Sequence, residues 1–134
     1  MTLEKIEAAA DFTVLELGRL SGTDFGYDEK SVRWLDDYIE KLRGLGAFDD
    51  PQEKNDLAGV FGAYLGECVV RCYGRAWRER DGSWIIDFDG KGSVFPLARA
   101  SKQIENGEED GIGSFFRGIP VVFAGVIRQP KPPI

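Results

Sequence analysis

The 134-residue chain contains no histidine. Histidine is the commonest general base and metal-binding side chain, and it completes the Ser-His and Cys-His pairs of many hydrolases. Its absence excludes those catalytic pairs and the usual imidazole metal sites. From the sequence we identify no catalytic residue, no metal site and no cofactor, so enzyme activity is an open but unfavoured interpretation.

Cysteine is scarce as well, with Cys68 and Cys72 as the only two. Two are too few for the usual structural zinc sites. They are four residues apart in a predicted helix, an arrangement poorly suited to a disulfide. We interpret both as small, reduced side chains that face the core, which favours a reducing compartment such as the cytoplasm.

Long hydrophobic segments are also missing. The longest mostly apolar run covers the nine residues 119–127 and contains a proline, whereas a membrane span needs about 20 residues. The first residues carry an acid at Glu4 and lack the apolar core of a signal peptide. We therefore expect a cytoplasmic protein that does not associate with a membrane.

Apolar residues make up 43% of the chain, enough to fill the core of one domain. We place that domain at residues 1–128 and an extended, proline-rich tail at 129–134.

Charge is distributed unevenly along the chain, whose formal net charge is −6. Residues 1–67 carry a net charge of −8, and residues 68–134 carry +2. Nucleic-acid binding requires clustered positive charge, so we do not expect it. The acidic half could attract a partner protein with a basic surface, or it could simply be the solvated surface of helices.

Apolar residues at three- and four-residue steps predict three helices in the first half, at about 3–17, 29–43 and 51–73. Asp50 and Pro51 have the order of a helix cap and a first helical residue. The third helix also contains glycines at 59, 62 and 66 near one face. Each costs up to about 1 kcal/mol relative to alanine, so we expect another element, or a ligand, to approach Gly59, Gly62 and Gly66 closely.

Asp81-Gly82 lies between two segments of β-forming residues, which is typical of a two-residue hairpin. Pairing across this turn places Trp77 and Trp84 on the core face of the hairpin. Arg78 and Arg80 lie on its other face, a candidate basic face for anions or acidic partners; the alternative is an ordinary solvated strand surface.

The remaining segments predict a short strand at 93–95, a helix from Pro96 to Asn106, a short helix near 112–116 and a buried strand at 121–127. The fold class is therefore α+β. N-terminal helices pack on one face of a small antiparallel sheet, with additional C-terminal helices and a C-terminal strand.

Glu67 lies in an otherwise apolar part of the third helix, four residues before Arg71. A buried carboxylate must be paired or protonated. One interpretation is a structural ion pair with Arg71 where helix and sheet meet. The other is an acid in a ligand or partner pocket beside Gly62 and Gly66, in which general acid–base catalysis would still require a second group.

Three stretches together resemble a family of small bacterial proteins of unknown function, over about residues 28–117. They are the residues 31–39, the segment 62–67 that leads to 73–77, and Phe95-Pro96 with Lys102 and Asn106-Gly107-Glu108. The resemblance implies a bacterial cytosolic protein and implies no catalytic residues.

These observations favour a non-catalytic protein-binding module, of the adaptor or toxin-neutralising type, that uses its acidic helical half. The alternative is a small-molecule-binding or hydrolytic domain with a pocket near Glu67.

Overall fold

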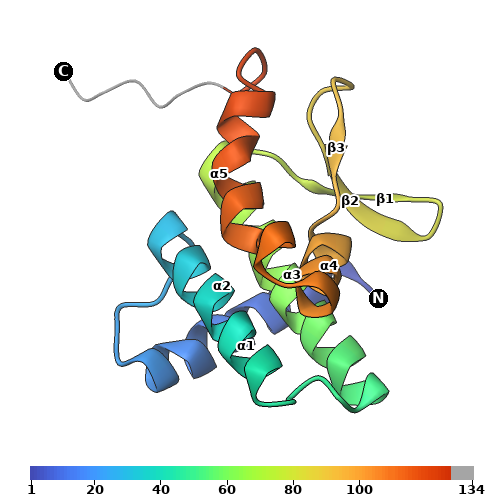
Figure 1. The fold of residues 1–134 in the computed structure, drawn as a ribbon. Coiled ribbons are helices and arrows are strands. Elements are labelled where there is room, and N and C mark those ends of the chain that lie inside the picture. The colour runs from blue at the N-terminus through green and yellow to red at the C-terminus, as the bar shows by residue number, and fades with distance from the viewer. Residues whose placement is uncertain (128–134) are drawn as a thin grey trace.

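Helix α3 (Pro51–Tyr73) runs through the middle of the molecule, and the other elements gather around it (Figure 1). The computed structural model describes residues 1–127. The predicted tail at 129–134 lies outside the described residues.

The helices α1 (Leu3–Ser21) and α2 (Glu29–Gly44) form the rest of the N-terminal half. Thr2, Asp28 and Asp50 each cap the helix that follows by accepting a hydrogen bond from a backbone N–H of its first turn. The predicted apolar stripes are buried or partly buried in all three helices, except that Leu3 at the start of α1 and Cys72 at the end of α3 are exposed. The predicted limits of α3, from Pro51 to Gly74, are confirmed.

A three-stranded antiparallel sheet follows, with the order β1 (Trp77–Arg80), β2 (Ser83–Asp87) and β3 (Ser93–Val94). The hairpin register is as predicted, with Trp77 opposite Ile86 and Glu79 opposite Trp84. Asp81 and Gly82 both have positive φ angles, as the tight two-residue turn requires. The α+β fold class is confirmed.

The two hairpin tryptophans differ in burial. Trp77 packs into the core, whereas Trp84 stays partly exposed and donates a hydrogen bond from Nε1 to the Met1 carbonyl. Both tryptophans contact the core, as their predicted face requires, but Trp84 is less buried than expected. It lies beside the hairpin turn, which projects away from the helices (Figure 1).

Three helical elements follow the sheet: α4 (Pro96–Asn106), a 3₁₀ turn (Glu108–Asp110) and α5 (Ile112–Val122). The strand predicted at 121–127 is therefore wrong. Helix α5 continues through Pro120, Val121 and Val122 are exposed, and the chain then turns. The apolar run is divided between a helix end and a turn, with only Phe123 and Ile127 buried in that turn.

Candidate functional site

Glu67 is buried near the C-terminal end of α3, with a side chain that is 7% exposed. Its Oε1 accepts a hydrogen bond from Arg71 Nε at 3.2 Å, and its Oε2 accepts one from the indole Nε1 of Trp77 at 2.9 Å. The predicted pair with Arg71 is thus present. Trp77 is a second partner that the sequence pattern did not reveal, because it comes from the hairpin.

The helical glycines near Glu67 allow two close approaches. A Cβ atom on Gly66 would lie 2.0 Å from the ring of Trp77, and one on Gly62 would lie 2.6 Å from the Cα of Leu97 in α4. The expected approach of a helix or a strand is confirmed at Gly62, which α4 covers, and at Gly66, which the first residue of β1 covers. It is wrong at Gly59, where nothing lies within 4 Å of a Cβ atom. These contacts and the two hydrogen bonds favour the structural interpretation of Glu67 over a pocket.

Arg71 connects this cluster to the loop between α1 and α2. Its guanidinium lies 3.8 Å from the ring centroid of Tyr27, and the Tyr27 hydroxyl donates a 2.5 Å hydrogen bond to Asp11. Burial and the hydrogen bond to Asp11 both raise the pKa of Tyr27, so this hydroxyl remains a donor at neutral pH. Arg71 is therefore in contact with groups from three parts of the chain.

Arg78 and Arg80 lie on one face of β1, as predicted, and an acid lies beside them. Their guanidinium groups are 3.9 Å and 3.8 Å from the carboxylate of Asp87 on β2. The backbone N–H of Gly90, the hydroxyl of Ser93 and these two arginines lower the pKa of Asp87. An anion bound at the candidate basic face would therefore compete with Asp87.

The cysteines differ in their environment. Cys68 is fully buried, and burial raises the pKa of its thiol. Cys72 lies in the last turn of α3 and is exposed, with its Sγ 3.4 Å from the carbonyl oxygen of Tyr27. The expectation that both face the core is wrong for Cys72, which lies beside the loop between α1 and α2 and is exposed there.

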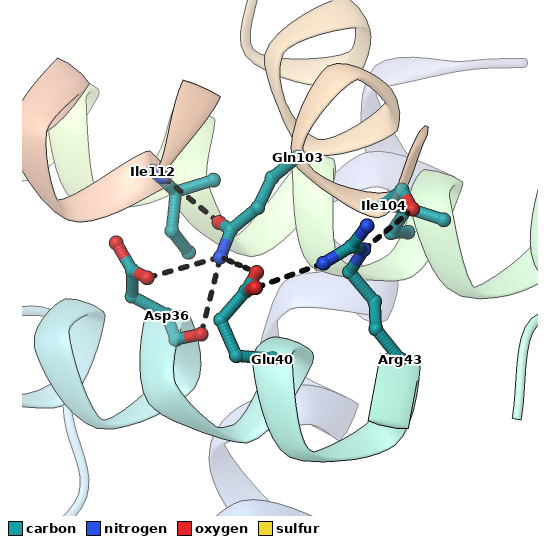
Figure 2. A network of polar contacts seen from close by, with 6 residues as sticks. All are labelled: Asp36, Glu40, Arg43, Gln103, Ile104 and Ile112. Atoms are coloured by element: carbon teal, nitrogen blue, oxygen red, sulfur yellow. Dashed lines mark hydrogen bonds and ion pairs between the residues drawn. The ribbon is translucent and has the colours of Figure 1, made fainter. Parts of the chain in front are cut away.

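A polar network joins α2 to the connection between α4 and α5 (Figure 2). Gln103 is fully buried, and its Nε2 donates to the side chains of Asp36 at 3.0 Å and Glu40 at 2.9 Å. Its Oε1 accepts from the backbone N–H of Ile112 at 2.9 Å. Arg43 completes the network by donating to Glu40 and to the Ile104 carbonyl.

Asp36 also caps α5 from another helix. Its Oδ2 accepts a 2.7 Å hydrogen bond from the N–H of Gly113 in the first turn of α5, and the N-cap residue Gly111 supplies no side-chain bond of its own. A Cβ atom on Gly111 or Gly113 would lie 2.8 Å from this carboxylate oxygen. Sequence reasoning missed the network. Asp36, Glu40 and Arg43 follow each other at steps of four and three along α2, which could have marked them as one face.

The acidic helical half contains a hollow of about 390 Å³ between α1, α2 and α3. Its lining is apolar except for the polar groups of Thr13, Glu16 and Tyr38. The full lining is Phe12, Thr13, Glu16, Leu17, Leu20, Tyr38, Leu42, Leu57, Val60 and Phe61. We call it the α1–α3 groove. Phe12 and Leu20 are 57% and 59% exposed at its edge. Sequence reasoning missed these two residues, although Phe12, Glu16 and Leu20 recur at four-residue steps beside the buried stripe of α1.

Comparison with known proteins found no matching family model, no matching curated protein and no matching solved structure. Among residues 1–127, no helix has a stretch long and apolar enough to cross a lipid bilayer. The same part of the chain brings together no group of three acidic or thiol side chains that could hold a metal ion.

Proposed function

We propose that this protein is a protein-binding module that receives an amphipathic helix of its partner in the α1–α3 groove. The observation that carries the proposal is the exposure of Phe12 and Leu20 beside an apolar hollow formed by three helices. Large apolar side chains that gather around a groove commonly mark interaction sites. Helix-in-groove recognition uses apolar anchors at three- and four-residue steps.

The charge of this half of the molecule defines the partner further. Residues 1–67 carry a net charge of −8, and the only side chain in the groove lining that is charged at neutral pH is Glu16. A helix with basic residues on either side of its apolar stripe complements such a surface and is attracted to it from a distance. In either an adaptor or a toxin-neutralising role, the protein would engage its partner through this groove.

The proposal is tested with substitutions at exposed positions, which should not disturb folding. Phe12→Glu and Leu20→Glu place charge in the groove. Leu15→Glu is the matched control, because Leu15 is on the same helix, is 54% exposed and does not line the groove. The wild type and the three variants are immobilised and used to capture partner proteins from a bacterial lysate. The basic segment of the captured partner is then synthesised, and its binding to each of the four proteins is measured by calorimetry.

We expect the synthetic segment to bind the wild type and Leu15→Glu with equal affinity, and to bind the two groove variants at least tenfold more weakly. Its affinity should fall as salt concentration rises. Equal binding to all four proteins, or a bound segment without an apolar stripe and basic residues, would overturn the proposal.

We also propose a cytoplasmic location in a bacterium. Cys68 and Cys72 are both free thiols in the structure, and free thiols persist in a reducing compartment. Fractionation of the native host with an antibody against the protein tests this, and recovery from the periplasm or the membrane would contradict it.

A further inference from the structure

A second cavity lies between α4, α5 and β3 and shares no residue with the α1–α3 groove. Its volume of about 460 Å³ is within the range typical of small-ligand sites. Apolar side chains form most of its wall, and the full lining is Ser93, Val94, Phe95, Ala98, Arg99, Lys102, Ser114, Phe115, Gly118, Ile119, Val122 and Phe123. We call it the α4–α5 cavity.

The charge of this cavity has one sign. Arg99 and Lys102 are its only ionisable side chains, and no acid lines it, although the whole chain has a net charge of −6. They are three residues apart on α4 and therefore lie on the same side of that helix. Within residues 1–127, Lys102 is in no ion pair. Arg99 pairs with Asp110 at 3.6 Å, so an anion in the cavity would compete with Asp110 for Arg99 but not for Lys102. Positive charge is thus available at an otherwise apolar cavity.

Gly118 widens the cavity, because it belongs to the lining and has no side chain. It lies inside α5, where a glycine costs up to about 1 kcal/mol relative to alanine. Gly62, Gly66 and Gly113 are explained by close neighbours, but nothing lies within 4 Å of a Cβ atom built on Gly118. No packing contact therefore requires this glycine. What it provides is open space in the wall of the cavity.

Large apolar side chains are also exposed where the cavity opens. Phe95 is 51% exposed and Val122 is 74% exposed, and both belong to the lining. Inside, the wall consists of Val94, Ile119 and Phe123, which are buried. A hydrocarbon group in the cavity would cover apolar surface at the opening and contact apolar surface inside, gaining roughly 25 cal/mol per Å² of apolar area removed from water.

We propose that the α4–α5 cavity binds a fatty-acid-like anion, with its carboxylate beside Arg99 and Lys102 and its hydrocarbon chain against Val94, Phe115 and Ile119. The guanidinium of Arg99 already lies 5.3 Å from the ring centroid of Phe115, so the cationic and apolar parts of the site adjoin. A carboxylate head pairs with the positive charge of the cavity. A hydrocarbon chain suits the rest of the wall, which is mostly apolar and has no acidic group. This site is independent of the proposed partner-binding groove.

The test uses decanoate, below the concentration at which it forms micelles, titrated into the ¹⁵N-labelled full chain and followed by NMR. We expect saturable binding with shifts concentrated at residues such as Lys102, Ser114 and Gly118. Decanol has the same chain without the charge and should bind at least tenfold more weakly. Equal binding of decanol, or shifts spread over the α1–α3 groove, would overturn the proposal.

Two pairs of variants make the test specific. Lys102→Glu reverses an exposed charge at the cavity and should weaken decanoate binding at least tenfold. Lys30→Glu does the same on α2, far from the cavity lining, and should leave binding unchanged. Gly118→Leu should fill the cavity and abolish binding, whereas Gly59→Leu, at another helical glycine with open space around it, should not.

Thermal melting shows whether each variant is folded, and Lys102→Glu tests the head-group contact even if Gly118→Leu does not fold. Sedimentation with anionic phospholipid vesicles tests whether the protein binds a membrane surface instead of a soluble ligand. Binding to vesicles without binding of soluble decanoate would replace the proposed site with a membrane-surface contact and would overturn the proposal. Retained decanoate affinity in Lys102→Glu would do the same.

Discussion

The hydroxyl of Tyr73, at the end of α3, donates a 3.3 Å hydrogen bond to the carbonyl oxygen of Phe116 in α5. In an uninterrupted helix this carbonyl would accept from the N–H of residue 120, but residue 120 is a proline and has no N–H. Tyr73 therefore supplies the donor that Pro120 lacks. The two rings also pack, with centroids 5.3 Å apart.

Removal of the Tyr73 hydroxyl should destabilise the protein by about 1–2 kcal/mol, because it leaves the Phe116 carbonyl without a donor. In the Pro120→Ala variant, the N–H of residue 120 is restored and can donate to the Phe116 carbonyl. Tyr73→Phe should therefore lower the free energy of unfolding measurably less in that variant. Urea unfolding of the four proteins in this cycle measures the difference. Tyr38→Phe is the control, because the Tyr38 hydroxyl has no hydrogen bond among the described residues, and additive effects at 73 and 120 would contradict the assigned contact.

Gly66→Ala and Gly59→Ala should have opposite effects on stability, although both are in α3. A Cβ atom at 66 would force the Trp77 ring away and would weaken its bond to Glu67, at a cost of about 1–3 kcal/mol. At 59 the space is open, and alanine should stabilise the helix by up to about 1 kcal/mol. Chemical denaturation measures both, and a neutral Gly66→Ala would show that Trp77 is not seated on α3.

Glu67→Gln should cost about 2 kcal/mol. The carboxylate accepts from Arg71 and Trp77 through separate oxygens, whereas a glutamine offers one acceptor and would direct its NH₂ group at the other donor. Glu79→Gln, on the exposed part of β1, should cost almost nothing. Unchanged stability together with a lost ligand or activity would instead support the pocket interpretation of Glu67.

Asp36→Ala should destabilise α5 by about 1–2 kcal/mol through the loss of its cap, with a further loss at Gln103. The amide of Gly113 should then exchange its hydrogen faster, which NMR detects directly. Asp37→Ala is the matched control, because Asp37 is the next residue, is exposed and has no hydrogen bond or ion pair within residues 1–127. Equal exchange at Gly113 in both variants would contradict the capping role.

The two thiols should differ in reactivity. Cys68 should resist labelling until the protein is denatured, whereas exposed Cys72 should react in the native state. Partial burial of its side chain, and then the negative charge of Asp28, raise the pKa of Cys72. A raised pKa means less thiolate at a given pH, so labelling should be slower than for an unstructured cysteine and should still accelerate above pH 8.5. A rate that levels off below that pH would contradict this environment.

Local sequence patterns alone determined the caps, the helical stripes and the hairpin. Asp28, Asp50 and Asp81-Gly82 act through neighbours within a few residues, so their effect does not depend on the rest of the fold. The Glu67–Arg71 pair was predictable for the same reason, since residues four apart in a helix are adjacent.

Tertiary structure decided the features that depend on distant partners. Periodicity could not show that Pro120 belongs to a helix, because the compensating donor is Tyr73, on another helix and 43 residues from Phe116 in sequence. The second partner of Glu67, the capping of α5 by Asp36 and the exposure of Cys72 likewise depend on which helix faces which. Local pattern specifies each element because its hydrogen bonds are local, whereas the groove and the cavity exist only where separate elements leave space between them.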